Sequence, residues 1–122
     1  MINIDHLTKI YGSTTVLDID QMEIPAGESF GLVGNNGAGK TTMFRCILDL
    51  IRPNTGTVQS RGANVAKSES WKEYTGSYLD DGFLIDFLTP EEYFTFVADI
   101  YGLTEGDIVA FFADFEEFFS NE

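Results

Sequence analysis

FGLVGNNGAGKTTMFRCIL, residues 30–48, is the stretch on which the fold of this chain depends. It begins with an apolar run, continues through a glycine-rich turn, and ends in a segment with helical spacing of apolar residues. We predict a buried central strand over residues 29–33, because both of its faces are apolar, and a helix over residues 40–50, which Pro53 ends. A glycine-rich turn between a strand and a helix is typical of α/β proteins that bind phosphate groups.

The turn contains a complete phosphate-binding motif. Residues 34–41 read GNNGAGKT and match every fixed position of G-x-x-x-x-G-K-[ST]. The glycines let the backbone curl with its N–H groups inward, and the following helix directs its positive end at the same anion. Lys40 would reach the β- and γ-phosphates of a nucleoside triphosphate, and the Thr41 hydroxyl would ligate Mg²⁺. The alternative is a glycine-rich turn that holds no ligand.

The rest of the chain predicts a mixed α/β domain without internal repeats. Alternating apolar and polar side chains, or short β-rich runs, predict strands at residues 2–6, 15–24, 57–60 and 75–79. A turn at residues 11–13 joins the first two strands as an antiparallel pair. Residues 66–71 fit no single pattern.

Two helices with clear start signals follow. Thr89 is the expected N-cap of the first, with Glu92 completing a capping box and Gly102 just past the end. Thr104 and Asp107 form the same arrangement at the second. The apolar faces that we predict are Tyr93, Phe96, Val97 and Ile100 on the first helix, and Ile108, Phe111, Phe112, Phe115, Phe118 and Phe119 on the second.

The second of these faces is unusually aromatic, since five of the 11 phenylalanines lie in residues 111–122. Burying so many rings requires a partner surface, and each ring contributes about 1.5 to 3 kcal/mol when it leaves water. We therefore interpret the chain as a truncated domain. The alternative is that the aromatic face packs back on the sheet of a complete one.

Charge is unevenly distributed along the chain. The net charge is −13, yet all seven lysines and arginines lie in residues 1–72, and residues 73–122 contain only acidic charges. This block disfavours nucleic acid and predicts a basic partner, although an acidic face that only aids solubility is the alternative. No run has the roughly 18 apolar residues of a membrane span, and we expect a cytoplasmic protein. The single cysteine, Cys46, is expected to be a buried structural thiol.

Residues 2–102 resemble the N-terminal half of the ATP-binding subunit of an ABC transporter. The resemblance is carried by LTKIYG at 7–12, by the motif and its continuation to Val58, and by LTPEEYFTFVADIYGL at 88–103. It implies an α/β fold of the P-loop NTPase class, an ABC-type ATP-binding core with an N-terminal antiparallel β-subdomain, here truncated. Its parts would be the β-subdomain and first core strand (1–33), the P-loop and following helix (34–52), further strands and a Q-loop-like region (53–88), and the start of a helical subdomain (89–122).

The resemblance also implies the ligand-binding residues. Those for the nucleotide are Tyr11, Val16, Asn36, Gly37, Ala38, Gly39, Lys40, Thr41 and Thr42. Tyr11 matches the aromatic residue that stacks on adenine, although a strand-end tyrosine packed on the core is the alternative. Thr41 and Asp80 would hold Mg²⁺, with Asp80 at the place of the family's glutamine unless the register slips to Asp81.

The implied function is Mg-ATP binding that, in full-length form, powers transport. The implied partners are a membrane-spanning subunit, which the loop at 78–87 would meet, and a second nucleotide-binding domain in a dimer at the inner face of the cell membrane. The family's Ser-Gly-Gly signature, its Asp-Glu pair and its switch histidine have no match in these 122 residues, and His6 is expected at the surface. We therefore assign no catalytic residue and predict binding without efficient hydrolysis. The alternatives are a scaffold that never hydrolyses ATP and a soluble ABC-type ATPase acting on nucleic acid, which the charge of −13 disfavours.

Overall fold

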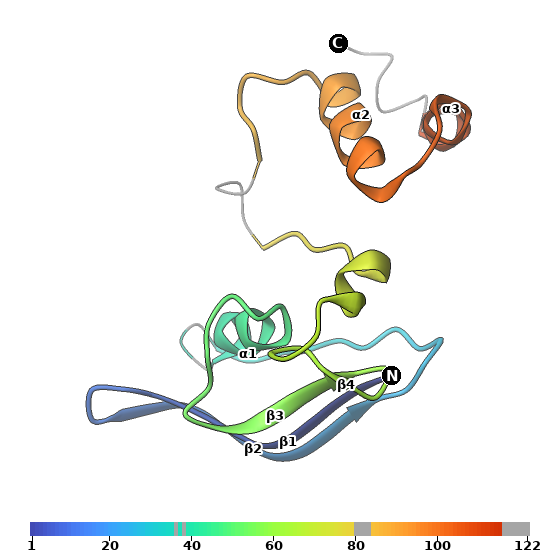
Figure 1. The fold of residues 1–122 in the computed structure, drawn as a ribbon. Coiled ribbons are helices and arrows are strands. Elements are labelled where there is room, and N and C mark those ends of the chain that lie inside the picture. The colour runs from blue at the N-terminus through green and yellow to red at the C-terminus, as the bar shows by residue number, and fades with distance from the viewer. Residues whose placement is uncertain (36, 38, 80–83, 116–122) are drawn as a thin grey trace. The chain divides into compact units, whose positions relative to one another are not determined.

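Four strands form one antiparallel sheet in the computed structural model, which describes residues 1–35, 37, 39–79 and 84–115 (Figure 1). The strands are β1 (Ile2–Tyr11), β2 (Thr14–Ile24), β3 (Thr55–Ser60) and β4 (Ala63–Asn64), and their order in the sheet is β2-β1-β3-β4. The chain divides into two compact units, Met1–Ser77 and Tyr78–Glu122. The sheet belongs to the first unit.

The predicted hairpin at the N-terminus is confirmed, and its first strand is longer than expected. β1 and β2 pair from Ile2↔Ile24 to Tyr11↔Thr14, so that the turn consists of Gly12 and Ser13. The predicted strand at 57–60 is also confirmed as β3, which pairs antiparallel with β1 on its other side. β1 is therefore the central strand of the first three.

A distortion in β1 explains why a glycine lies within β3. His6 has a φ of 48°, and the pairing of β1 with β3 shifts register between Asp5 and Thr8. Gly56 has a φ of +85°, and a Cβ atom there would lie 2.5 Å from the Asp5 carbonyl oxygen and closer still to that of His6. Only glycine allows this approach, because it has no Cβ atom and accepts a positive φ.

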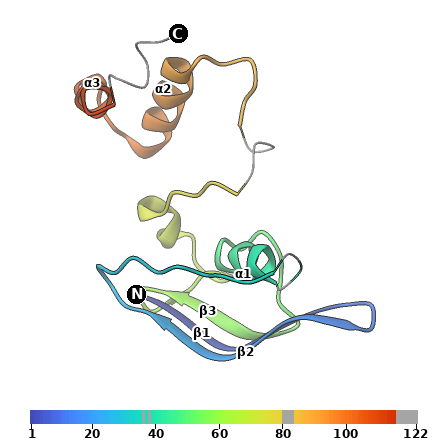
Figure 2. The ribbon, with the colours of Figure 1, turned by 180° about the vertical axis from the view of Figure 1, so that it is seen from behind.

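Helix α1 (Lys40–Ile47) packs on one face of the sheet, as both views of the ribbon show (Figures 1 and 2). The hydrophobic core of this unit consists of residues that are each less than 10% exposed to solvent: Ile4, Leu7, Leu17, Met43, Cys46, Val58, Val65 and Trp71. Trp71 lies in the 3₁₀ helix η1 (Ser70–Tyr74), and its indole N–H donates to the Val65 carbonyl at 3.1 Å. Burial raises the pKa of the Cys46 thiol, as expected for a structural cysteine.

Two predicted strands are wrong. Residues 29–33 form no strand, and the side chains of Phe30 and Val33 are 50% and 96% exposed. Residues 75–79 likewise form no strand. A strand requires a neighbour for its N–H and C=O groups, and no described strand pairs with either segment. The apolar run at residues 29–33 and the short β-rich run at residues 75–79 were therefore insufficient to predict strands.

The second unit contains α2 (Pro90–Tyr101) and α3 (Glu105–Ala113), and both predicted capping boxes are confirmed. The Thr89 side chain accepts from the Glu92 backbone N–H at 3.2 Å, and Gly102 ends α2 with a φ of 69°. Thr104 and Asp107 make the reciprocal pair in α3. Hydrogen bonds from the backbone N–H and hydroxyl of Thr104 hold the pKa of Asp107 below its usual value.

The apolar face predicted for α2 is only partly covered, with Tyr93 and Val97 as its partly buried residues. Ala98 is the buried residue of α2, whereas Phe96 and Ile100, from the predicted face, are 48% and 64% exposed. The ring centroid of Phe94 lies 5.3 Å from the centroids of both Phe111 and Phe112 of α3. The contact with α3 thus selects the stripe centred on Phe94 and Ala98. The predicted Phe118 and Phe119 lie outside the described residues. None of the described helices is long and apolar enough to span a membrane.

Candidate functional site

The N-terminus of α1 is open to an anion. Its N-cap residue, Gly39, has φ 91° and ψ 6°, no side chain caps the helix, and its first turn contains no acidic residue. The Met43 N–H donates to the Gly39 carbonyl at 2.9 Å. The backbone N–H groups of residues 40–42 therefore precede the regular helical bonding, and they lie where the helix dipole is positive.

Gly39 is also held close to the sheet. A Cβ atom at this position would lie 2.6 Å from the Val16 carbonyl oxygen and 3.3 Å from the Leu17 Cδ1 atom, and its φ of +91° disfavours any other residue. The backbone of β2 thus presses directly against the turn that begins α1. This contact gives the predicted motif a fixed position relative to the hairpin.

One pocket brings together six of the predicted nucleotide-binding residues. It has a volume of about 330 Å³ and is lined by Val16, Gly37, Gly39, Lys40, Thr41 and Thr42. Two further predicted residues, Asn36 and Ala38, lie outside the described residues. Val16 reaches the pocket from β2, whereas the others come from the turn and the first turn of α1.

The Lys40 side chain folds back over the turn. Its ammonium group donates to the Asn35 carbonyl oxygen at 2.9 Å and to the Gly34 carbonyl oxygen. A phosphate group that binds here would compete with two neutral carbonyls for this ammonium, and a charged acceptor makes the stronger hydrogen bond. Lys40 is therefore held beside the pocket by bonds that an anion can replace.

Tyr11 is an exposed ring rather than a core residue. It ends β1 and is 49% exposed, which argues against the alternative of a tyrosine packed on the core. The turn between β1 and β2 lies at the same end of the first unit as the N-terminus of α1 (Figures 1 and 2). The residues that line the 330 Å³ pocket do not include Tyr11, so the structure leaves its ring next to solvent.

The donor set suits Mg²⁺ bound together with phosphate. Thr41, which carries a hydroxyl oxygen, lines the pocket, and the other predicted ligand, Asp80, lies outside the described residues. The part of the chain that the structure describes holds no cluster of three or more histidine, cysteine or carboxylate groups. Magnesium commonly takes one or two protein oxygens and completes its shell with phosphate and water, so a protein cage is not needed.

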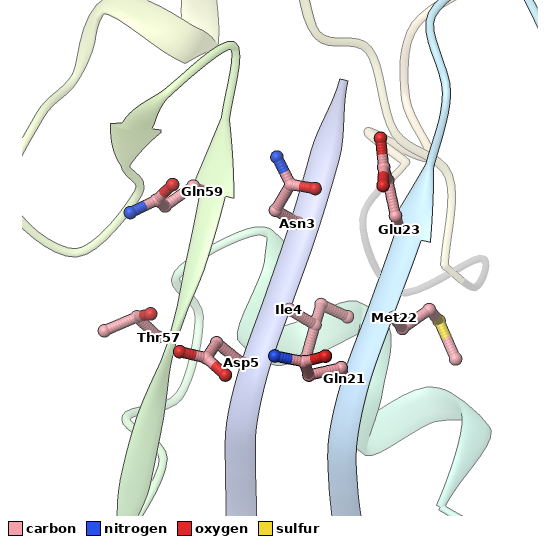
Figure 3. A pocket seen from close by; sticks show the side chains of 8 residues that line it. All are labelled: Asn3, Ile4, Asp5, Gln21, Met22, Glu23, Thr57 and Gln59. Carbon is pink, nitrogen blue, oxygen red and sulfur yellow. The ribbon is translucent and has the colours of Figure 1, made fainter.

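A second pocket, of about 410 Å³, lies on the opposite face of the sheet from the core and is distinct from the phosphate motif (Figure 3). Asn3 lies between Glu23 and Gln59 in the register, and Asp5 lies between Gln21 and Thr57. These side chains project from three strands toward solvent, as the alternation of polar residues in an antiparallel sheet predicts. We interpret this face as a solvated surface.

One residue near the site was not predicted from the sequence. The Lys9 ammonium lies 5.1 Å from the centroid of the Tyr11 ring and donates to the Arg52 carbonyl at 2.8 Å. Strand spacing would have linked Lys9 to Tyr11 only if the first strand had been predicted beyond residue 6, because alternate residues of a strand lie on the same side. Arg52 could not have been linked to them, since it lies 43 residues further along the chain.

This chain matches a family model and relatives that are named as ATP-binding proteins. The family model described as "ABC transporter" matches residues 17–118. A bacitracin transport ATP-binding protein of Enterococcus faecalis is 45% identical over 64 residues, which cover 52% of this chain and 21% of that protein. A linearmycin resistance ATP-binding protein of Bacillus subtilis is 32% identical over 108 residues, or 88% of this chain and 35% of that protein.

The fold is matched as well. The solved structure of an ATP-binding subunit of an ABC transporter superposes with a TM-score of 0.67 at 27% identity. The match covers 86% of this chain and 44% of that one. The chain therefore spans less than half the length of each of these relatives.

Proposed function

The chain belongs to the ABC transporter family, and from this premise we propose that it binds Mg-ATP at the N-terminus of α1. Proteins of this family bind ATP through their ATP-binding subunits and use it to power transport. We extend that role to this chain. In a protein as long as its relatives, nucleotide binding at this site would power a transporter that moves its substrate across a membrane.

One observation carries the proposal: Lys40, Thr41 and Thr42, the first residues of α1 at its uncapped N-terminus, line one pocket. Backbone N–H groups and a lysine ammonium bind the phosphate oxygens, and their positive charge offsets the charge of the triphosphate. The Thr41 hydroxyl binds Mg²⁺, and the Thr42 hydroxyl binds a further phosphate oxygen. When bound, Mg²⁺ would supply positive charge that offsets the negative charge of the triphosphate.

The base of the nucleotide belongs at the hairpin. Tyr11 offers an exposed ring for stacking on adenine, and Val16 offers an apolar surface next to the pocket. Stacking contributes affinity with little selectivity, because every base has a π face. Asn36 and Ala38 complete the phosphate-binding turn, and Asp80 remains our proposed second ligand for Mg²⁺.

Proteins of this family generally hydrolyse ATP, whereas we propose that this chain alone binds ATP without efficient turnover. Hydrolysis requires an acid that holds Mg²⁺ through water and a group that orients the attacking water. Neither the family's Ser-Gly-Gly signature nor its Asp-Glu pair is found in these 122 residues. We therefore expect this chain to bind ATP whether or not it hydrolyses it.

We further propose a cytoplasmic chain at the inner face of a membrane, with a membrane-spanning subunit and a second nucleotide-binding domain as partners. Residues 73–122 contain acidic charges and no lysine or arginine. Cytoplasmic loops of membrane proteins carry an excess of lysine and arginine, so the two surfaces would be complementary. The same charge disfavours nucleic acid as a partner.

The first test is a calorimetric titration of the chain with Mg-ATP, in parallel with its Lys40→Ala and Lys67→Ala variants. Lys67 is an exposed lysine of the same unit, so its replacement changes the net charge equally. We expect the wild type and Lys67→Ala to bind Mg-ATP and Lys40→Ala to lose at least about tenfold in affinity, since a charge-assisted bond contributes about 1.5 to 3 kcal/mol. Equal affinity of all three chains would contradict the assignment of the site.

Released phosphate, measured in the same samples, tests the second part of the proposal. We expect saturable binding with no sustained release. Sustained turnover that Lys40→Ala abolishes would show that the chain already holds a hydrolytic group, and binding without turnover would then be wrong.

A further inference from the structure

The exposed Tyr11 ring is contacted by a charged neighbour that the phosphate motif does not use. The Lys9 ammonium lies over the ring at 5.1 Å from its centroid, within the range of a cation–π interaction. The two residues are separated by one position on β1, and their side chains therefore leave the strand on the same side.

The Lys9 ammonium is itself anchored. It donates to the Arg52 carbonyl oxygen at 2.8 Å, in the segment that connects α1 to β3. Burial raises the pKa of the Cys46 thiol of α1, and the positive charge of Lys9 partly opposes this effect. The ammonium thus bridges the α1–β3 connection and the aromatic ring.

The backbone that carries the ring is tied to the same connection. The Asn54 N–H donates to the Thr8 carbonyl at 2.8 Å, and the Asn54 side-chain oxygen accepts from the Ile10 N–H at 2.8 Å. These bonds hold the strand on both sides of Lys9. Without a side-chain contact, however, an exposed tyrosine at a strand end could still rotate about its χ1 and χ2 angles.

We propose that Lys9 is a positioning residue for the nucleotide base: anchored on the Arg52 carbonyl, its ammonium holds one face of the Tyr11 ring and leaves the opposite face for adenine. This inference rests on the proposed function, since it assigns a role at the same site. Its physical basis is preorganisation, because a ring that is already oriented loses less conformational entropy when the base stacks on it.

A purely electrostatic role for Lys9 predicts a different pattern. A lysine that only attracts phosphate groups would contribute to the affinity for inorganic triphosphate as much as for ATP. A positioning residue for the base contributes to ATP alone. The two ligands share the triphosphate and differ in the adenosine, so their affinity ratio separates the two roles.

The experiment measures the affinities of the 122-residue chain for Mg-ATP and for magnesium with inorganic triphosphate. The variants are Lys9→Met, which keeps most of the aliphatic stem, Lys9→Arg, which keeps the charge and the donors, and Lys67→Met as the control of equal charge change. We expect Lys9→Met to weaken ATP about two- to fivefold, the range of an exposed cation–π contact, and to leave triphosphate unchanged. Lys9→Arg and Lys67→Met should retain the wild-type ratio.

A double-mutant cycle then links Lys9 to the ring. In the Tyr11→Ala background, which should itself weaken ATP and spare triphosphate, Lys9→Met should cause no further loss. Unchanged ATP affinity in Lys9→Met, equal losses for both ligands, or an undiminished loss in the Tyr11→Ala background would each overturn the inference. Failure of the proposed function is a separate result, in which the wild type binds neither ligand or Lys40→Ala binds both as well as the wild type does.

Discussion

Two glycines, Gly39 and Gly56, show how a missing methyl group determines local structure. Gly39 allows the phosphate-binding turn to contact the Val16 carbonyl, and Gly56 allows β3 to contact the distorted part of β1 at His6. Both residues have a positive φ, so any other side chain faces two penalties, backbone strain and steric overlap. The first glycine belongs to a known motif. The second is recognisable only from the strand that lies beside it.

Gly56→Ala should destabilise the first unit strongly. A Cβ atom would overlap the His6 carbonyl oxygen in addition to adopting a φ of +85°. We expect the free energy of unfolding to fall by about 3 kcal/mol or more, as the sum of left-handed strain and overpacking. Urea denaturation followed by Trp71 fluorescence measures this loss, because Trp71 is buried in the same unit.

Gly62→Ala is the matched control. Gly62 has a similar φ of +80°, yet nothing lies within 4 Å of a Cβ atom at this position. Its replacement should cost only the strain, about 1 to 2 kcal/mol. If both variants lose the same stability, the close approach of Gly56 to β1 has no energetic role.

Helix ends illustrate what is predictable at the level of an element. The capping boxes of α2 and α3 were predicted correctly, because each consists of residues only three positions apart. The strand expected at residues 29–33 was wrong, and the stripe of α2 that packs on α3 is centred on Phe94 and Ala98, outside the predicted apolar face. Both depend on which other element lies alongside, and helical or strand periodicity carries no such information.

Thr89→Ala should loosen the start of α2. The Thr89 hydroxyl accepts from the Glu92 N–H at 3.2 Å, and losing an N-cap of this kind costs about 1 kcal/mol. We expect amide exchange in the first two turns of α2 to become about fivefold faster. Exchange of individual amides, measured by nuclear magnetic resonance, tests this without requiring the whole chain to unfold.

Thr95→Ala provides the comparison within the same helix. The Thr95 hydroxyl donates to the Glu91 carbonyl at 2.8 Å. Unlike the Thr89 hydroxyl, which accepts from a backbone N–H group at the start of the helix, it lies within the helix. Alanine has the higher helix propensity, so exchange should be unchanged or slower. If amide exchange became faster by the same factor in Thr89→Ala and Thr95→Ala, the loss of a threonine side chain in general, rather than the loss of the N-cap, would explain the weaker helix.

For the molecule as a whole, the division into two units has a thermodynamic consequence. The described core of Met1–Ser77 contains eight apolar residues of below a tenth exposure, whereas the described part of the second unit contains Ala98 alone in that class. Burial of apolar surface is the main source of stability, so the second unit should be the weaker.

Denaturation should therefore give two transitions. Trp71, the single tryptophan, reports on the first unit, while most of the helical dichroism comes from the second, since α2 and α3 have 12 and 9 residues and α1 has 8. We expect the dichroism midpoint at a lower urea concentration than the fluorescence midpoint. Phe94→Ala, which removes the ring that contacts α3, should move only the dichroism transition; coincident curves in both chains would indicate a single cooperative molecule.

The α/β fold of an ABC-type ATP-binding subunit was predictable from the sequence and is supported by the matched family and structure. So were the hairpin, the helix after the phosphate motif and the two capping boxes, because their deciding residues are neighbours along the chain. Tertiary structure alone decided the close contact at Gly56, the stripe of α2 that meets α3, and the bridge from Arg52 through Lys9 to Tyr11. Each of these joins segments that are distant in sequence, and their side-chain contacts arise only when the chain brings those segments together.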